Sequence, residues 1–410
     1  MKTILFVDDE PRLLDALARM LRPRRHEWDM TFVAGGEAGI AALDAGTFDV
    51  LVTDMRMPVV DGVAVLRHAR ERSPRTVRIA LSGQTELAVM TRSVSLVHQF
   101  LAKPCDPVVL RSVIERVCAL QALLNDPHLQ HVVGQLGELP VLPRTYERFA
   151  AELESPETSI ASIVRIVEQD VVLAARCLQL ANSAYFGLRR PVDTLEQAVS
   201  YLGIGMLRDL VLSTVAFSSF TPGRQLTDAG LARLERHSVV VANVARAILD
   251  QHELSQQAFM AGMLHDIGVL ILATCGTSAS GAVSDHEICG WTDGDGERHA
   301  ADADVRHDTM ERVTHAEVGA YLLGLWGLPH AIVEAVAFHH QPARARPDRF
   351  DVLGAVYTAN QLVHEIESSD RSSAPSDAAG LETFLEDVGF GQRLADLREI
   401  AVTLTSAARE

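Results

Sequence analysis

The alternation of short apolar runs with helical patterns across residues 1–122 constrains the fold of this chain more than any other feature. The apolar runs predict strands at Thr3–Val7, Met30–Val33, Val50–Thr53, Thr76–Leu81 and Gln99–Leu101. Helical spacing follows each run, at Pro11–Leu21, Gly36–Asp44, Gly62–Arg70, Glu86–Ser93 and Pro107–Leu124. Strands separated by helices pair in parallel and are covered on both faces. We therefore expect an α/β doubly wound domain with a five-stranded parallel sheet.

Polar side chains stand where these strands end. Asp8 and Asp9 follow the first strand, and Asp54 follows the third. The carboxyl ends of parallel strands open onto one crevice, so the three carboxylates are expected to converge and to favour Mg²⁺, which binds carboxylate and phosphate oxygens. Ser82 and Lys103 end the fourth and fifth strands and would suit a phosphoryl group. Helix capping would account for the first two aspartates alone, but not for polar residues at all these strand ends.

Beyond residue 128 the strand pattern stops, and helical patterns take over. They recur at Ile160–Gln169, Val171–Ala181, Leu195–Leu202, Met206–Ala216, His237–Asp250, Gln257–Leu264, Ala316–Trp326, Ala331–Phe338 and Asp351–Ile366. Two segments lack apolar periodicity and are expected to be loops, Thr277–Asp308 and Arg371–Ala379. We therefore expect an all-α second half, joined to the first through residues 125–127.

Six chemically active residues mark expected ends of these helices. They are His237, His265, Asp266, His315, His339 and His340. We expect His237 to open its helix. Imidazoles and a carboxylate at helix ends can converge inside a bundle, where they suit Zn²⁺, Fe²⁺ or Mn²⁺. The alternative is that the histidines hydrogen-bond to one another and to water, without an ion.

Charge and composition exclude several classes of function. The chain has 54 acidic and 37 basic residues and a formal net charge of −17, so nucleic acid and anionic lipid would repel it. No basic recognition helix is visible, and we expect no direct DNA binding. Five scattered cysteines fit a reducing compartment. The sequence shows no secretion signal and no apolar run of about 18 residues, so a cytoplasmic protein without a membrane span is expected.

Motifs at the strand ends of the first half identify its family. They are VDDE (Val7–Glu10), TDMRMP (Thr53–Pro58), DG (Asp61–Gly62), ALSG (Ala80–Gly83) and KP (Lys103–Pro104). With them, residues 2–122 resemble the flavodoxin-like receiver domain of two-component response regulators. The resemblance implies that Asp54 is the phosphoacceptor and that a cognate histidine kinase is the donor. It also implies that Asp9, Asp54 and the Arg56 carbonyl hold Mg²⁺, with Asp8 in support.

The same resemblance assigns the response to phosphorylation. Ser82 and Lys103 would sense the phosphoryl group. Phe100 stands at the position of the family's switch aromatic, and its alternative role is that of a simple core aromatic. Phosphorylation would then bias the face formed by the fourth strand, the fourth helix and the last helix, and so alter docking or dimer pairing.

Long motifs in the second half point to another family. They are Leu139–Phe149, Ile166–Gly187, Thr194–Ser213 and Gly324–Pro342. With them, roughly residues 132–345 resemble HDOD (HD-related output) domains, which serve as non-catalytic signalling modules. The block ANSAYFG includes Tyr185 and Phe186, which are expected to pack between helices, and Gly187 is expected to end a helix.

The order of histidines also resembles the metal-dependent HD phosphohydrolases, especially the HD-GYP phosphodiesterases of cyclic dinucleotides. This chain departs from their pattern at several positions. Val269 replaces a lysine, Arg233 replaces a glutamate one turn before the first histidine, and Asn360 replaces the last metal-binding aspartate. The Gly-Tyr-Pro signature is absent, since residues 341–343 read Gln-Pro-Ala. The positive charge of Arg233 and the loss of negative charge at Asn360 weaken the binding of two metals.

The expected protein is therefore a cytoplasmic response regulator with a receiver at 1–122, a helical linker at 123–131, an HDOD domain at 132–345 and flanking helices at 346–410. Its output is expected to be contact with a downstream signalling protein, and it is expected to form a homodimer. We expect Mg²⁺ in the receiver and at most a single transition metal in the second half. The alternatives are a receiver-gated phosphodiesterase or phosphohydrolase and a cyclic-dinucleotide-binding effector.

Overall fold

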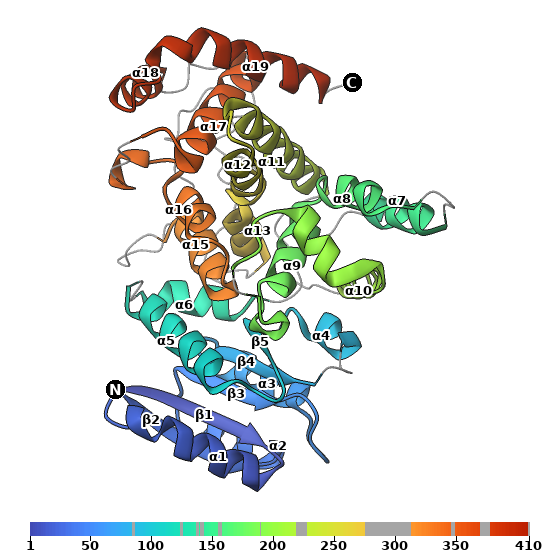
Figure 1. Ribbon diagram of the computed structural model, residues 1–410, viewed down its shortest axis with the longest axis vertical. Coiled ribbons are helices and arrows are strands. Elements are labelled where there is room, and N and C mark those ends of the chain that lie inside the picture. Colours follow the sequence, from blue (N-terminus) through green and yellow to red (C-terminus); the bar gives the residue numbers. More distant parts are fainter. Residues whose placement is uncertain are drawn as a thin grey trace.

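The computed structural model places a parallel sheet at one end of the molecule and a larger helical half above it (Figure 1). It describes residues 1–408 except 84–86, 124–125, 137–138, 140–142, 155–157, 189, 219–227, 275–312, 346–348 and 370–377. The expected loop Thr277–Asp308 lies outside the described residues, as do Cys275 and Cys289. So do residues 371–377 of the second expected loop, whose last two residues instead begin helix α18 (Ala378–Asp387).

The sheet confirms the fold class expected from the strand pattern. Its strands are β1 (Lys2–Asp8), β2 (Trp28–Ala34), β3 (Val50–Asp54), β4 (Val77–Ser82) and β5 (Gln99–Ala102). All neighbours pair in parallel, in the order β2-β1-β3-β4-β5. The central strands are buried along their whole length, which explains why they are apolar runs without polar alternation.

Helices cover both faces of this sheet. They are α1 (Pro11–Leu21), α2 (Gly36–Ala45), α3 (Gly62–Arg72), α4 (Leu87–Ser93) and α5 (Pro107–Leu123), with a short 3₁₀ turn, η1 (Arg22–Arg24). Helix α1 packs beside α5, and α2 packs beside α3. The expected helix starting at Pro107 is confirmed, and proline suits this first-turn position because it has no N–H to leave unpaired.

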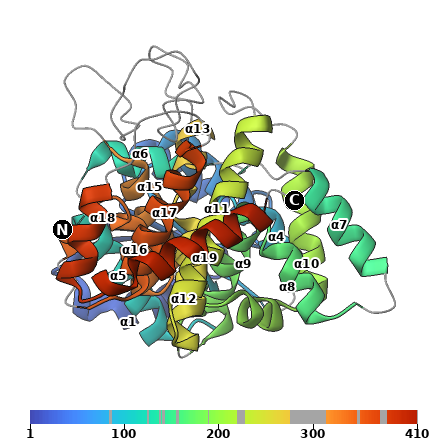
Figure 2. The ribbon, with the colours of Figure 1, turned by 90° about the horizontal axis from the view of Figure 1, so that it is seen from above.

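The described residues of the second half form helices and the turns that join them, with no strand among them. Its longer elements are α6 (Pro127–Gly134), α7 (Pro143–Glu154), α8 (Ile160–Val167), α9 (Val171–Ala181), α10 (Leu195–Ser218), α11 (Asp228–Ile248), α12 (His252–Leu264), α13 (Ile267–Thr274), α15 (His315–Trp326), α16 (His330–Phe338), α17 (Val352–Ser369), α18 and α19 (Leu394–Ala407). Short 3₁₀ turns are η2 (Ala184–Phe186), η3 (Pro342–Ala345) and η4 (Gly391–Arg393). Figure 2 shows α19 lying across α11 and α17, at the end of the molecule away from the sheet.

One expected helix start was wrong. Helix α11 begins at Asp228, so His237 lies inside it and does not open it. The charged residues that precede His237 hid this start, although Leu231 and Leu234 among them are buried at helical spacing. Helix α10 is kinked at Gly203, which confirms the break expected between Leu195–Leu202 and Met206–Ala216. The φ of Gly203, 73°, lies in the left-handed region that glycine enters without strain.

One apolar stretch has the length and composition of a membrane span, contrary to the expectation from the sequence. It is His252–Thr274, which runs through α12 and α13 and has a mean hydropathy of 1.4 over its most apolar window. Of that window, 78% is buried inside the protein. The stretch is apolar because it forms the core of the helical half, where α11, α15, α16 and α17 surround it.

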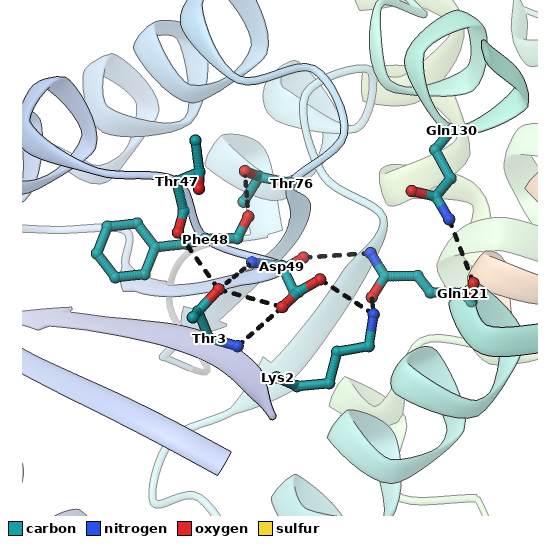
Figure 3. Close-up of polar contacts among 8 residues, drawn as sticks. All are labelled: Lys2, Thr3, Thr47, Phe48, Asp49, Thr76, Gln121 and Gln130. Atoms are coloured by element: carbon teal, nitrogen blue, oxygen red, sulfur yellow. Dashed lines mark hydrogen bonds and ion pairs between the residues drawn. The ribbon is translucent and has the colours of Figure 1, made fainter. Parts of the chain in front are cut away.

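A polar network ties α5 and α6 to the amino-terminal edge of the sheet (Figure 3). Asp49 accepts hydrogen bonds from the Thr3 amide at 2.8 Å and from Lys2 Nζ at 3.0 Å. Burial raises the pKa of Asp49, but these two donors outweigh it and lower that pKa overall. Gln121 on α5 donates to the Asp49 carbonyl, and Gln130 on α6 donates to the Gln121 carbonyl. The start of the second half is therefore held at the amino-terminal edge of the sheet, opposite the carboxyl ends of the strands.

The two halves also meet at the connection between α4 and β5. Gln179 on α9 donates to the Val97 carbonyl at 2.8 Å and to the Val94 carbonyl at 3.2 Å. Arg176, one turn earlier, donates to the Val94 carbonyl and to Gln179 Oε1. All four residues are buried. Helix α9 thus supplies the donors that buried carbonyls of the first half require.

Other contacts extend this interface along β5 and α5. Gln99 on the edge strand donates to the Leu325 carbonyl of α15 at 2.8 Å. Gly324 of the same helix lies against Leu120 of α5, where a Cβ would come 3.0 Å from the leucine side chain. Helix α10 packs against α4. The helical half therefore covers the face that α4, β5 and α5 form.

Within the first half, a buried arginine also hydrogen-bonds to the connection between α4 and β5. Arg78 on β4 donates through Nε to the Leu96 carbonyl at 2.7 Å, and its backbone N–H donates to His98 Nδ1 at 3.0 Å. Burial lowers the pKa of Arg78 to about 9. Burial and the neighbouring guanidinium also hold the pKa of His98 well below its ordinary value of 6.5.

We predict that His98 makes the protein less stable in mild acid. Its folded-state pKa is depressed, so the unfolded chain binds a proton first as the pH falls below about 6.5. The free energy of unfolding should then decrease by about 1.4 kcal/mol per pH unit from this group alone. Asn in its place can still accept the Arg78 N–H but does not titrate. Urea unfolding between pH 6.5 and 5 should therefore show a shallower pH dependence for His98→Asn, and equal slopes would contradict this account.

Candidate functional site

The structure brings the strand-end residues of the first half into one acidic pocket. Lys103 Nζ lies 2.8 Å from Asp8 Oδ2 and 2.8 Å from Asp54 Oδ1. Carboxylate oxygens of Asp8, Asp9 and Asp54 lie within 4.8 Å of one another. Asp8 and Asp54 are buried, whereas Asp9 is exposed. The pocket therefore combines two enclosed carboxylates, one open carboxylate and an ammonium group.

Strand register explains this convergence. Val7 pairs with Thr53, so the residues that follow them, Asp8 and Asp54, stand side by side at the ends of β1 and β3. Ser82 is the last residue of β4 and pairs with Ala102 of β5, directly before Lys103. Adjacent parallel strands and the residue after β5 thus bring four side chains of three kinds to one crevice.

Gly62 lets helix α3 approach the acidic pocket. A Cβ at this position would lie 1.9 Å from the Asp54 carbonyl oxygen, far inside van der Waals contact. Asp61 caps the helix just before it, through a hydrogen bond from the Ala64 amide to Asp61 Oδ1 at 2.8 Å. The Asp-Gly pair of the sequence motif therefore serves the close packing of α3 behind Asp54.

Burial and charge act against each other in this pocket. Burial raises the pKa of the Asp54 carboxyl, and the hydrogen bond and charge of Lys103 only partly offset the rise. Burial lowers the pKa of Lys103, but Asp54 and Asp8 outweigh it and raise that pKa. The lysine therefore keeps its charge, and three carboxylates face one cation. This excess of negative oxygen ligands fits Mg²⁺.

The structure also places the remaining predicted receiver residues. The Arg56 backbone hydrogen-bonds to the Asp54 carboxylate, which puts the Arg56 peptide at the pocket rim. Ser82 is buried at the end of β4. Phe100 is buried in the core on β5, where it pairs with Ala80. Its packing fits a core aromatic, and its role as a switch stays a prediction.

The predicted histidines of the second half converge on Asp266. His265 Nε2 lies 3.2 Å from Asp266 Oδ2, and His315 Nε2 lies 3.3 Å from Asp266 Oδ1. His339 Nε2 lies 3.6 Å from the same Oδ1, and His340 Nε2 lies 3.0 Å from His315 Nε2. Ligand atoms of Asp266, His315, His339 and His340 lie within 4.8 Å of one another. Imidazole nitrogens with one carboxylate form a donor set that fits a transition metal.

Five packed helices position these side chains. His265 follows the last residue of α12, His315 opens α15, and His339 follows the last residue of α16. Gly268 allows α13 and α15 to touch, since a Cβ there would lie 1.9 Å from the His315 carbonyl oxygen. His237 enters from α11, and Asn360 from α17. The order of histidines in the sequence could not show how these helices position the side chains, because that depends on how distant helices cross.

Sequence reasoning missed two residues of this pocket. His364 and Glu367 on α17 join His237 in a second group whose ligand atoms lie within 4.8 Å of one another. A signal was present, because Asn360, His364 and Glu367 follow one another at a spacing of four and three residues and share a helix face. The site residues expected from the sequence ended with Asn360, which replaces the last metal-binding aspartate of the HD phosphohydrolases.

Electrostatics in the pocket keep Asp266 charged and His339 and His364 neutral, whereas the hydrogen bond and charge of Glu367 outweigh burial and raise the pKa of His237. Burial raises the pKa of Asp266, but His265 and hydrogen bonds from three histidines outweigh it and hold that pKa well below its ordinary value. Burial lowers the pKa of His339 to about 4. Burial and the neighbouring His237 lower the pKa of His364 to about 3. Neutral rings have the free lone pairs that metal binding requires.

The ANSAYFG block reaches the first half, which the sequence analysis did not foresee. The hydroxyl of Tyr185, in η2, donates to the Gly83 carbonyl at 3.3 Å. Gly83 directly follows Ser82 of the acidic pocket. The Tyr185 ring stacks edge-on against Phe186 at 5.3 Å, and Gly187 ends the turn with a φ of 60°. The block therefore contacts the receiver rather than packing only among helices of its own half.

Family models match both halves of the chain. The response regulator receiver domain matches residues 4–115, and the HDOD domain matches residues 139–342. The chain is therefore a response regulator. It belongs to those regulators that join an N-terminal receiver to an HDOD output domain, as the motifs predicted.

Curated relatives share parts of this architecture. An "Uncharacterized protein" of Treponema pallidum is 26% identical over 64% of this chain and 49% of its own length. The hydrogenase transcriptional regulatory protein HoxA of Cupriavidus necator is 34% identical over 31% of this chain and 26% of its own length. The transcriptional regulatory protein TcrA of Mycobacterium tuberculosis is 29% identical over 44% of this chain and 72% of its own. The chain thus spans about half of the first relative and about a quarter of the second.

Among solved structures, the MmoQ response regulator of Methylococcus capsulatus is similar to this chain. It is 22% identical, and the match covers 64% of this chain and 98% of that one with a TM-score of 0.45. The receiver domain of AraT from Geobacillus stearothermophilus is 27% identical over 30% of this chain and 98% of that one, with a TM-score of 0.29.

Proposed function

We propose that the receiver takes a phosphoryl group on Asp54 from a cognate histidine kinase and thereby controls how the HDOD domain docks on it. The observation that carries this proposal is the contact between Tyr185 and Gly83, because it joins the HDOD domain to the loop beside the acidic pocket. The output is contact with a downstream signalling protein in the cytoplasm. No direct DNA binding and no membrane contact are part of this function.

The acidic pocket supports the acceptor chemistry. Asp54 carries the carboxylate oxygen that attacks phosphorus, and the bond between phosphorus and the histidine of the kinase breaks on the opposite side. Asp9, Asp54 and the Arg56 carbonyl would hold Mg²⁺, with Asp8 in support, and the ion when bound neutralises charge on the phosphoryl oxygens. Lys103 can exchange its contact with Asp54 for one with a phosphoryl oxygen.

The path to the HDOD domain is short. A phosphoryl group on Asp54 draws the Ser82 hydroxyl toward it, and the Gly83 carbonyl moves with the same chain segment. The Tyr185 hydroxyl then loses its acceptor, and the contacts of Arg176 and Gln179 with the adjoining connection loosen. Phosphorylation therefore releases the face formed by α4, β5 and α5. Once uncovered, this face is available for pairing with a second copy, which gives the expected homodimer.

The histidine pocket favours a second candidate function. Asp266, His315, His339 and His340 would hold a single transition metal, which when bound could activate water for phosphate-ester hydrolysis. Rapid hydrolysis also needs cationic help for the leaving phosphate. Val269 stands where HD-GYP enzymes have a lysine, and the side chain of Val269 is buried. We therefore place catalysis, and the binding of a cyclic dinucleotide without turnover, second to the interaction role.

We predict that Asp54→Asn abolishes labelling by acetyl phosphate in the presence of Mg²⁺. Asp54 combines a strand-end position with direct contact to Lys103, and an amide cannot attack phosphorus. Phosphoprotein gels or intact mass spectrometry would measure the labelling. Asp44→Asn, a partly exposed aspartate on α2, serves as the control and should be labelled normally. Full labelling of Asp54→Asn would contradict the acceptor assignment.

We predict that phosphorylation of the full chain increases hydrogen–deuterium exchange in α4 and η2 and raises self-association measured by light scattering. Tyr185→Phe should raise exchange there without phosphorylation, since it removes one hydrogen bond worth about 1 kcal/mol but keeps the ring. Tyr201→Phe, at an exposed position on α10, is the matched control. Unchanged exchange and unchanged mass in fully phosphorylated protein would overturn the docking mechanism.

We predict that hydrolysis of cyclic di-GMP by the full chain is absent or very slow, in either phosphorylation state. The physical reason is the missing lysine at Val269, because the departing phosphate then lacks cationic help. Product chromatography after incubation with Mn²⁺ or Fe²⁺ would measure turnover. Robust turnover that is lost in His265→Ala would make the phosphodiesterase the first candidate instead.

A further inference from the structure

The histidine pocket continues beyond Asp266 toward helix α17. His237 belongs to two ligand groups, one with His265 and Asp266 and one with His364 and Glu367. It is buried on α11, and its ring centroid lies 4.6 Å from that of His364. Its Nδ1 lies 3.4 Å from Glu367 Oε2. The far end of the pocket thus has its own carboxylate and its own pair of imidazoles.

The orientation of His237 indicates which ring nitrogen faces this end. Its Nε2 lies 3.0 Å from Asn360 Oδ1, and an amide oxygen can only accept a hydrogen bond. Nε2 therefore carries the hydrogen in this arrangement, and Nδ1 faces the Glu367 carboxylate, whose hydrogen bond and charge outweigh burial and raise the pKa of His237. Two acceptors that face each other require a cation between them, either a proton or a metal.

The donor set favours a metal. Two imidazoles and a glutamate are a ligand set that binds Zn²⁺ with one position left open, at ligand distances of about 2.0–2.2 Å. Ligand atoms within 4.8 Å of one another can reach one such ion with a small adjustment of side chains. Histidine ligands also commonly donate their second ring N–H to a fixed acceptor, and Asn360 is that acceptor here.

We propose that His237, His364 and Glu367 form a second binding position for a first-row transition-metal dication, separate from the position around Asp266, His315, His339 and His340. Asn360 is then a positioning residue rather than a lost ligand, because it orients His237. Glu367 supplies the negative charge that Asn360 lacks. The bound ion joins α17 to α11, although α17 lies beyond the residues that the HDOD model matches.

Metal stoichiometry tests this proposal without any assay of activity. The full chain is made without a histidine tag, stripped with a chelator, equilibrated with Zn²⁺ in excess Mg²⁺ and measured by elemental analysis. Glu367→Gln should bind one equivalent of Zn²⁺ less than the wild type, and His340→Ala should lose the other equivalent. In Asn360→Ala the Kd of the second equivalent should rise by about 10-fold to 100-fold.

Glu365→Gln is the matched control, since Glu365 lies two residues away on α17 and its carboxylate is 3.5 Å from Arg398. It should keep the full wild-type content. Circular dichroism checks that each variant is folded, and His364→Gln provides a second test of the same position if Glu367→Gln does not fold. Equal zinc content in Glu365→Gln and a folded Glu367→Gln or His364→Gln variant would overturn the proposal, because a proton rather than a metal would then bridge His237 and Glu367.

Discussion

The backbone carbonyls between α4 and β5 are the constraint on which the arrangement of the whole molecule depends. They are buried at the junction of the two halves, and buried carbonyls must find donors. The Leu96 carbonyl finds Arg78 within the receiver, whereas the Val94 and Val97 carbonyls find Gln179 of the HDOD domain. This one connection therefore belongs to both cores at once, and any shift in it changes the fit of the HDOD domain.

The two candidate sites bring metal-binding side chains together with different balances of charge. In the receiver, carboxylates gather at strand ends, and Lys103 balances part of their charge. In the HDOD domain, imidazoles from several helices gather around the charge of Asp266, with Glu367 at the far end of the pocket. The first arrangement suits a hard, hydrated cation and a phosphoryl group, and the second suits a softer transition metal. Tyr185 lies beside the first site, so communication between the domains does not have to pass through the second.

The sequence predictions were accurate where the signal was local in the chain. Strand ends in a parallel sheet must share one crevice, so Asp8, Asp54 and Lys103 could be placed together from their positions alone. Helix packing has no comparable rule, because crossing angles and contacts depend on the shapes of side chains. This is why the spacing of His364 and Glu367 along one helix face could not show that they meet His237 of α11. The start of α11 at Asp228 was missed for a local reason, the charged residues that precede His237.

The two families, the order of sheet and helices, and the strand-end pocket could be read from the chain alone, because apolar periodicity and short motifs are local properties. The folded arrangement was needed to show that the HDOD domain covers the α4–β5–α5 face and that Tyr185 meets Gly83. It alone also decided that α17 completes the histidine pocket. Each of these contacts joins residues far apart in the chain, and their partners are selected by packing and by the need to satisfy buried polar groups, which no local pattern encodes.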